Sequence, residues 1–388
     1  MKYNFDEVHN RKNTNSLKYD FAVERGKPED VLPLWVADMD FKVPDEVIKA
    51  IKDKADHGIF GYSEPKSEYF KALTNWSKKR NGFEPDPEKY VITCGVVFAL
   101  CSLLRVLTQK GDGVIILQPV YYPFEGSISA NERKLIVSEL KNSDGYYTAD
   151  FEDFERKIVE NNVKVFILCN PHNPVGRVWK REELQKLGEI CLKHNVFVIA
   201  DEIHCDFAFG ENRHITFPSI SKQFAENCAV CTSPSKSFNL AGLQISNIYI
   251  ENDIVRGQLI KELDKQGYSQ PNVFGIVACQ AAYEYGEDWF EQLKAYLAEN
   301  IQFVQEYLAA NLPKVGFRIP EGTYLVWLDL RKYGYSDEQL EDLMQNKAKL
   351  WLDGGYIFGK GGSGFERINV ACPRSVLKEA LDRLKSVL

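Results

Sequence analysis

The middle third of the chain alternates short apolar, β-branched runs with amphipathic stretches in which apolar residues recur every three or four positions. Short apolar runs bounded by polar residues predict buried strands, and the amphipathic stretches predict surface helices. This alternation is typical of an α/β sheet. We expect strands at 113–117, 163–169, 196–200, 229–232 and 244–250, and helices at 97–108, 151–161 and 181–194.

The C-terminal part of the chain predicts a second, smaller α/β unit. Residues 272–311 predict a long helical pair, broken near Tyr285 and Gly286, that links two domains. Beyond this pair we expect strands at 316–320, 323–330 and 367–371, and helices at 337–347 and from Arg374 to the end. With 388 residues, and about 100–200 residues per domain, two domains are the natural expectation.

Composition and charge narrow the function classes. Hydrophobic residues make up 44% of the chain and charged residues 27%, which is ordinary for a globular protein. The 48 basic residues are outnumbered by 55 acidic ones, so the positive excess expected of a nucleic-acid-binding protein is missing. The amino terminus has no apolar signal-peptide core, and no run approaches the ~18 apolar residues that span a bilayer. We therefore expect a cytoplasmic protein without nucleic-acid or membrane partners.

The nine cysteines are odd in number and scattered, which is typical of reduced cysteines in a cytosolic core. Cys228 and Cys231 form the one CxxC pair, but they fall in a predicted strand. Residues three apart on a strand face opposite sides of the sheet, so this pair is a poor zinc or redox site. We expect no metal.

Chemically useful residues follow several of the predicted strands, at the sheet edge where open α/β sheets bind their ligands. Asn173 and Asp201 each follow an apolar run, Lys236 lies in a loop of small hydroxyl residues, and Gly95 opens a helix. Each has an ordinary explanation: a turn, a helix cap or a solvated lysine. Together they form the set that pyridoxal phosphate requires, namely a Schiff-base amine, an acid, an amide and a phosphate seat.

Two other motifs do not carry a function. Residues 359–364 match GxGxxG, but they precede a predicted strand instead of joining a strand to a helix, so a dinucleotide-binding fold is disfavoured. The sequence Asp201-Glu202-Ile203-His204 resembles the acidic box of nucleotide-driven helicases. That reading requires a GxxxxGK[ST] loop, which the chain lacks.

At these motifs the chain resembles fold-type I pyridoxal-phosphate enzymes, and more narrowly the PatB/MalY-type cystathionine β-lyases of the aminotransferase class I/II superfamily. The most specific segments are WVADMDF at 35–41 and NPHNPVGRVW at 170–179. Phe98 and Ser237 depart from the usual pattern of the subgroup. The resemblance implies a large domain, 50–285, with a mainly parallel seven-stranded sheet, and a small domain built from 1–49 and 286–388. It also implies a homodimer with active sites at the interface.

The resemblance implies a role for each matched residue around the cofactor. Lys236 is the Schiff-base lysine that also shuttles the Cα proton, and Asp201 pairs with the ring nitrogen. Asn173 binds the ring hydroxyl and lies beside the substrate, while Tyr121 stacks on the ring. The phosphate is held by Gly95, Val96, Val97 and Ser233, with Tyr62 reaching it from the partner subunit.

Further matches concern the substrate. Arg367 binds the α-carboxylate through a bidentate fork, and Tyr122 lies beside the substrate. Tyr121, Tyr122 and Tyr62 are open alternatives for donating a proton to the leaving sulfur. His204 either steadies the ring hydroxyl or is an ordinary buried histidine.

The activity that the resemblance implies is β-elimination of a sulfur amino acid, such as cystathionine or another cysteine S-conjugate, to pyruvate, ammonia and a thiol. Gln244 stands where many aminotransferases carry an arginine for the phosphate, and the lyase subgroup shares this difference. Two alternatives stay open: a pyridoxal-phosphate-dependent aminotransferase, and a non-catalytic regulatory protein of the same fold.

Overall fold

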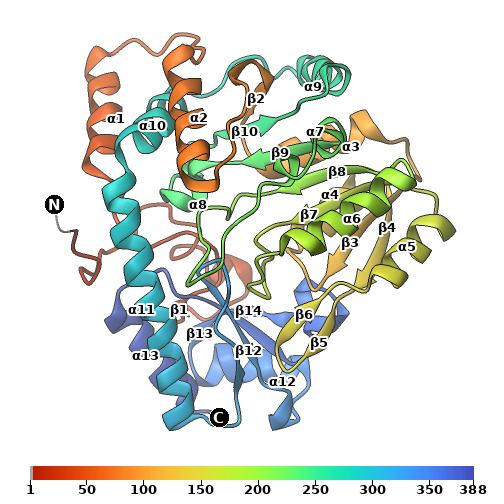
Figure 1. The fold of residues 1–388 in the computed structure, drawn as a ribbon. Helices are drawn as coiled ribbons and strands as arrows, with labels where there is room; N and C mark the ends of the chain where they lie inside the picture. Colours follow the sequence, from red (N-terminus) through yellow and green to blue (C-terminus); the bar gives the residue numbers. More distant parts are fainter. Residues whose placement is uncertain (1–2) are drawn as a thin grey trace.

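A seven-stranded sheet forms the centre of the computed structural model, which describes residues 3–388 (Figure 1). Five neighbouring strands run parallel, and β10 is antiparallel to both of its neighbours. The mainly parallel seven-stranded sheet that the family resemblance implies is confirmed. In spatial order the strands are β2 (Tyr90–Thr93), β10 (Ser246–Tyr249), β9 (Cys228–Thr232), β8 (Phe197–Asp201), β7 (Val163–Cys169), β3 (Gly113–Gln118) and β4 (Lys134–Glu139).

Helices cover both faces of this sheet, which explains why its strands read as nearly continuous apolar runs. All six residues of β3 are buried. One face packs against α3 (Val96–Leu107), α4 (Pro123–Ala130) and α9 (Asp253–Lys265). The other face packs against α5 (Phe151–Glu160), α6 (Arg181–Lys193) and α7 (Lys222–Glu226).

The CxxC cysteines illustrate this two-sided burial. Cys228 belongs to the core on the α5 and α6 side, whereas Cys231 belongs to the core on the α3 side. The prediction that the two side chains face opposite sides of the strand is confirmed. All nine cysteines are free thiols in the structure.

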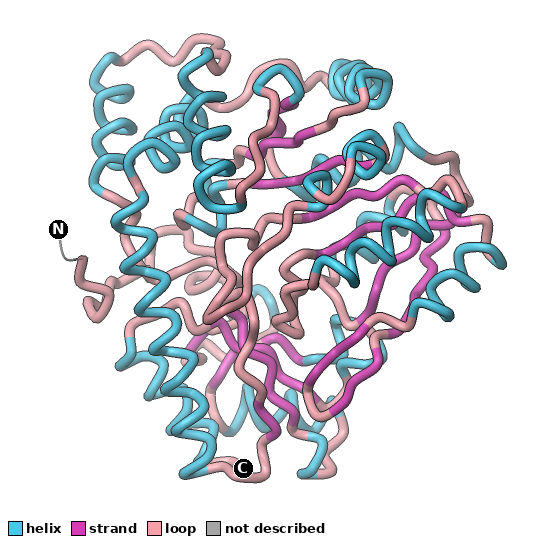
Figure 2. The backbone as a smooth tube through the Cα atoms, viewed as in Figure 1, coloured by secondary structure: helices cyan, strands magenta, loops and turns pink. Residues whose placement is uncertain are grey.

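The C-terminal strands form a separate antiparallel sheet, seen below the central sheet in Figure 2. Its order is β11 (Gly316–Phe317), β12 (Leu325–Asp329), β15 (Phe365–Asn369) and β14 (Asp353–Gly354). Helices α12 (Asp337–Asp342) and α13 (Arg374–Lys385) belong to this part of the chain. The N-terminal segment joins it, because β1 (Leu32–Pro33) pairs in parallel with β13 (Leu350–Trp351).

A helical pair connects the two sheets. Helix α10 (Val273–Tyr285) ends at Gly286, and α11 (Glu287–Asn311) begins directly after it, so the predicted break is confirmed. Helices α1 (Asp45–His57) and α2 (Ser67–Asn81) pack against α10. The predicted domain boundary at residue 50 falls inside α1. The division into two domains stays a prediction.

Several element bounds differ from the predicted ones because single residues adopt left-handed backbone conformations. Gln244 has φ 49° and Thr323 has φ 68°, so β10 begins at Ser246 and β12 at Leu325. The predicted helix 337–347 is α-helical only over α12 and continues as a π-helix, Leu343–Lys347. Residues 359–364 contain one short 3₁₀ turn, Lys360–Gly362, before β15, as expected for a motif that is not a dinucleotide loop.

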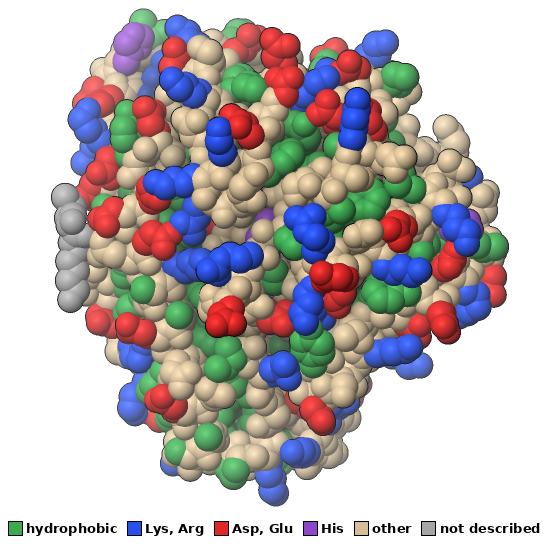
Figure 3. Space-filling model, in the orientation of Figure 1, with side chains coloured by type: hydrophobic (Ala, Val, Ile, Leu, Met, Phe, Trp, Pro, Cys, Tyr) green, Lys and Arg blue, Asp and Glu red, His purple; other side chains and the backbone are tan. Residues whose placement is uncertain are grey.

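The surface carries charges of both signs. On the face that Figure 3 shows, basic and acidic side chains are intermingled over the whole outline. Within residues 3–388, no helix has the length and apolarity that crossing a membrane requires.

Candidate active site

The residues singled out in the sequence gather at one edge of the central sheet. Asn170 follows β7, Asp201 is the last residue of β8, and Ser233 follows β9. Tyr121 lies three residues beyond β3, and Gly95 lies two beyond β2. All five strands end at the same edge because β2, β3, β7, β8 and β9 run in the same direction. This is the edge where open α/β sheets place their ligands.

Lys236 lies on the short helix α8 (Pro234–Ser237), which Ser233 caps by accepting a hydrogen bond from the backbone of Ser235. The side chain is half-buried and lines a hollow of 780 Å³. Its Nζ donates to the carbonyl oxygen of Ala37 at 2.8 Å. Burial lowers the pKa of Lys236 to about 8, with Asp38 opposing the shift and Arg367 adding to it. A neutral amine is therefore accessible close to physiological pH.

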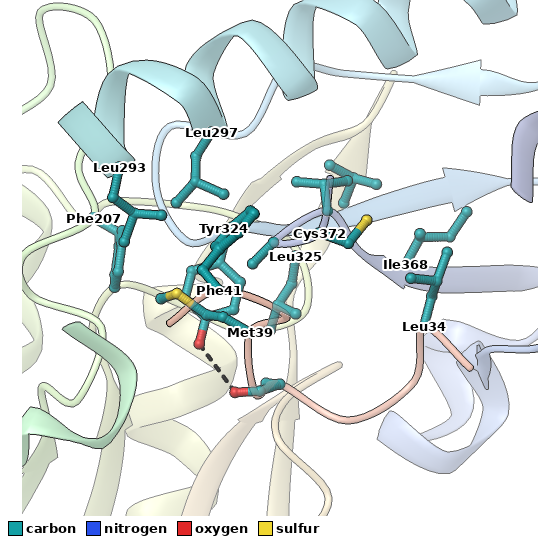
Figure 4. Close-up of a cluster of buried hydrophobic side chains, with 14 of the residues drawn as sticks. Leu34, Met39, Phe41, Phe207, Leu293, Leu297, Tyr324, Leu325, Ile368 and Cys372 are labelled. Carbon is teal, nitrogen blue, oxygen red and sulfur yellow. Dashed lines mark hydrogen bonds between the residues drawn. The ribbon is translucent and has the colours of Figure 1, made fainter. Parts of the chain in front are cut away.

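The segment that supplies this carbonyl is the WVADMDF motif, fixed by hydrogen bonds from distant residues. The Tyr324 hydroxyl donates to Ala37 O at 3.0 Å, the dashed line in Figure 4. Asn369 Nδ2 donates to the carbonyl oxygens of Val36 and Asp38, on either side of Ala37, at 2.8 and 2.6 Å. Asn239 Nδ2 donates to Met39 O and Phe41 O at 3.0 and 3.1 Å. The sequence singled out this motif by resemblance alone, and its contact with Lys236 was missed.

Asp201 is a buried carboxyl, and none of the cationic side chains within residues 3–388 is in hydrogen-bond contact with it. Its Oδ1 accepts from the backbone N–H of Ile203 at 3.1 Å. Burial raises the pKa of Asp201 to about 7, although the Ile203 hydrogen bond and the charge of Lys236 both act to lower it. Such a carboxyl is matched to a protonated ring nitrogen, which would stabilise its charged form.

Arg367 and Asn173 come from different sheets and meet at the site. Arg367 is a buried residue of β15, and one terminal nitrogen, NH1, donates to Asn173 Oδ1 at 3.1 Å. The other, NH2, donates to Trp35 O at 2.6 Å and to Asp353 Oδ2. Nε is buried and has no hydrogen-bond partner among the described residues. Asp353 was missed, since a two-residue strand leaves no alternation to read.

Two tyrosines and a histidine lie around this group. Tyr121 donates its backbone N–H to Asn173 O at 3.0 Å, and burial raises the pKa of its hydroxyl. Tyr122 is 36% exposed, and its ring lies 5.7 Å from that of Phe358. His204 is buried 5.7 Å from the Tyr324 ring, and its Nδ1 has no hydrogen-bond partner in the described chain. The choice between the two roles of His204 stays open.

The start of α3 fits a phosphate. Gly95 is its N-cap, so the first backbone N–H groups of the helix are free to bind an anion. A Cβ built on Gly95 would meet no atom within 4 Å, so there is open space in front of the helix. Val96 is buried and Val97 is 38% exposed. Ser233 Oγ donates to Ile245 O at 2.7 Å.

Tyr62 lies in the loop between α1 and α2 and is 96% exposed. It lines a hollow together with Cys94, the neighbour of Gly95, and Gln244. Because the structure holds a single chain, the role of Tyr62 across a subunit interface stays a prediction.

The donor set fits pyridoxal phosphate on four separate counts. An amine of lowered pKa, a buried carboxyl of raised pKa, an arginine with an unused N–H and an open helix N-terminus lie at one sheet edge. Within residues 3–388, no three His, Cys, Asp or Glu side chains are grouped to hold a metal ion.

The fold and this site define a member of a large enzyme family. The profile of the aminotransferase class I and II family matches residues 29–384, and the chain belongs to that family. Fold-type I architecture, as the motifs predict, is confirmed.

Individual relatives narrow the comparison. Cystathionine β-lyase PatB of Bacillus subtilis is 41% identical over 385 residues, covering 99% of this chain and 100% of PatB. MalY of Escherichia coli is 33% identical and covers 98% of this chain and 97% of MalY. The pyridoxal-phosphate-bound C–S lyase of Staphylococcus hominis superposes with a TM-score of 0.94 at 36% identity, covering 100% of this chain and 98% of the lyase. The predicted resemblance to the PatB/MalY subgroup is confirmed.

Proposed function

We propose that this protein is a pyridoxal-phosphate-dependent carbon–sulfur lyase that acts on cystathionine or another cysteine S-conjugate. The observation that carries the proposal is the grouping of the half-buried Lys236 with the buried Asp201 and Arg367, in a chain that aligns end to end with a cystathionine β-lyase. The products are pyruvate, ammonia and a thiol.

The chain supplies a group for each part of the cofactor. Pyridoxal phosphate, when bound, supplies an aldehyde that condenses with amines and a ring that withdraws electrons from the substrate Cα. Lys236 would hold the aldehyde, Asp201 would pair with the ring nitrogen and Asn173 with the ring hydroxyl, and Tyr121 would stack on the ring. The N–H groups of residues 95–97, with Ser233, would hold the phosphate. His204 is proposed as a cofactor contact on the strength of its burial beside Lys236 and Tyr324.

Arg367 and Lys236 then orient and deprotonate the substrate. The guanidinium binds the α-carboxylate, which fixes the amino acid relative to Lys236. Once the substrate amine has taken its place on the aldehyde carbon, the freed Lys236 amine, with its pKa lowered to about 8, would accept the proton from Cα. The Cβ–S bond breaks, sulfur takes a proton, and one water converts the remaining three-carbon enamine to pyruvate and ammonia. Tyr121, Tyr122 and Tyr62 remain the candidates for donating the proton to sulfur.

We further propose that the enzyme is a homodimer with shared active sites and that it works in the cytoplasm. The support for the dimer is an exposed apolar group of Ile59, Phe60 and Tyr62, which are 66%, 59% and 96% exposed on the loop after α1. The support for the cytoplasm is the nine free thiols.

The test is a product assay on purified protein loaded with pyridoxal phosphate. One sample receives cystathionine, and another receives an amino acid with a keto acid; pyruvate, thiol and exchanged amino groups are measured in both. We expect pyruvate and thiol release to be faster than amino-group exchange. Robust exchange, with no thiol released from cystathionine, cysteine or an S-alkyl cysteine, would show an aminotransferase instead. No turnover in either sample would favour the regulatory alternative.

A further inference from the structure

Asp353 and Arg367 face each other across two strands of the C-terminal sheet. They are register partners in the antiparallel pair of β14 and β15, so their side chains lie on the same face. Both are buried, and Arg367 NH2 donates to Asp353 Oδ2. Nothing in the comparison with relatives or in the predicted site explains this acid.

The contacts of Arg367 show which of its donors are already used. NH2 donates to both Trp35 O and Asp353, and NH1 donates to Asn173. The guanidinium carbon lies 4.9 Å from the centre of the Phe358 ring, which limits rotation of its plane. Nε, in contrast, is buried without a hydrogen-bond partner in the described chain. A guanidinium has five N–H groups, so Nε–H and one NH1 hydrogen are left for another acceptor.

We infer that Asp353 is a positioning residue for substrate binding: its carboxylate oxygen holds the NH2 end of Arg367 and thereby fixes the guanidinium plane so that the unused Nε–H faces the α-carboxylate. This inference rests on the proposed function, because it assigns the substrate carboxylate to Arg367. The long arginine side chain otherwise has several rotatable bonds, and fixing it in advance removes an entropy cost from each binding event.

Asp353 also carries a negative charge. The effect of this charge on substrate binding is opposite in sign to the effect of its acceptor oxygen. A buried arginine without a counter-charge would attract a substrate carboxylate more strongly, so loss of the negative charge alone favours binding. Loss of the acceptor oxygen disfavours binding. A single substitution mixes the two effects, and a pair of variants separates them.

D353N and D353A both remove the charge, but only asparagine keeps an oxygen that accepts from NH2. We expect the KM for an S-alkyl cysteine to be about 10- to 100-fold higher in D353A than in D353N, the range for a hydrogen bond to a charged group. The kcat values of the two variants are expected to agree within about threefold, because the contact is made before and during the reaction alike. A KM ratio below about threefold, or a loss confined to kcat, would overturn the inference.

Binding of ligands that lack either the amine or the carboxylate of the substrate provides a second readout. 3-(Methylthio)propionate has the carboxylate and thioether of S-methylcysteine but no amine, whereas 2-(methylthio)ethylamine has the amine but no carboxylate. We expect the Kd of the first, measured by calorimetry, to differ between D353A and D353N by the same factor as KM. The Kd of 2-(methylthio)ethylamine should be the same in D353A and D353N. Equal affinities for the carboxylate ligand would contradict the positioning role, and they would do so even if the wild-type protein eliminated no thiol.

Controls separate positioning from damage to the fold. E366Q changes a buried carboxyl next to Arg367 in sequence that makes no hydrogen bond to it, and its KM should stay within about twofold of wild type. If D353A does not fold, D353L replaces it, since leucine has the same number and branching of side-chain heavy atoms as asparagine and offers no acceptor. Pyridoxal phosphate affinity, measured by fluorescence, should be the same in all of these variants. A parallel loss of cofactor affinity would show a general defect and overturn the inference.

Discussion

Lys236 donates a 2.8 Å hydrogen bond to the carbonyl oxygen of Ala37, a residue 199 positions away in the chain. The N-terminal segment is thus part of the active site, and hydrogen bonds from Tyr324, Asn369 and Asn239 fix it there. The amine therefore has a defined partner whenever it is not bonded to the cofactor. Four tests follow from the geometry around it.

Replacing Lys236 by alanine should abolish the covalent cofactor link and essentially all thiol release. The visible absorbance of the protein mixed with pyridoxal phosphate should shift to that of non-covalently bound cofactor. The protein should stay folded, because removing an amine whose charged form is disfavoured by burial leaves no unpaired charge behind. Far-UV circular dichroism and a thermal melt check the fold. Wild-type turnover in K236A would mean that another lysine serves.

Asp201 predicts a pH-dependent difference in stability between the apoprotein and its D201N variant. The folded-state pKa is raised from 3.8 to about 7, so the folded protein binds a proton that the unfolded chain has already lost between these values. This contribution is present below pH ~4 and is lost as the pH rises through about 7. The melting temperature of D201N relative to wild type should therefore increase from pH 4 to pH 7 and then level off.

The control for this titration is D144N, which neutralises an exposed aspartate far along the chain from the site. Its melting temperature relative to wild type should change little over the same pH range. A D201N difference that is independent of pH would contradict the buried, uncompensated carboxyl. In the loaded enzyme D201N should also lower turnover, because an amide does not stabilise a protonated ring nitrogen.

Gly95 tests the phosphate seat without disturbing the core. A Cβ at this position meets no protein atom, so G95A should melt at the same temperature as wild type when cofactor is absent. The methyl group would project into the space that the phosphate is proposed to occupy, and the Kd for pyridoxal phosphate should rise about tenfold or more. G257A, in α9, is the matched control, because its Cβ also meets no atom. Unchanged affinity in G95A would place the phosphate elsewhere.

Tyr62 allows a direct test of shared active sites. Sedimentation should show a dimer, and Y62A and K236A should each have little activity alone. If Tyr62 serves the partner subunit, a hybrid dimer of Y62A and K236A contains one complete site, so mixing the two after mild dissociation should restore about a quarter of wild-type activity. If Tyr62 serves its own subunit, no hybrid site is complete and the mixture stays inactive. A stable, fully active monomer would contradict the dimer altogether.

Much of the fold and several site residues follow from sequence, because the signals are local. A run such as 163–169 is apolar on both faces, so it predicts a central strand wherever the rest of the chain lies. Asp201, the last residue of β8, and Asn173, four residues beyond β7, were found because chain continuity alone places polar residues near the end of such a strand at the sheet edge. The helical pattern of the sequence also predicted the break at Gly286.

What only the tertiary structure decided is which distant groups touch. Asp353 lies in a strand of two residues and Ala37 contributes only a backbone carbonyl, so neither has a side-chain pattern that marks it in the sequence. Their roles arise because β14 pairs with β15, which places Asp353 beside Arg367 only 14 positions away, and because the N-terminal segment contacts Lys236 and Tyr324 across 199 and 287 positions. The sequence alone predicted β3, β7, β8, β9 and β10 of the central sheet, but not β2 or β4. The pKa of Lys236 and the aim of Arg367 depend on burial and on partners that only packing brings together.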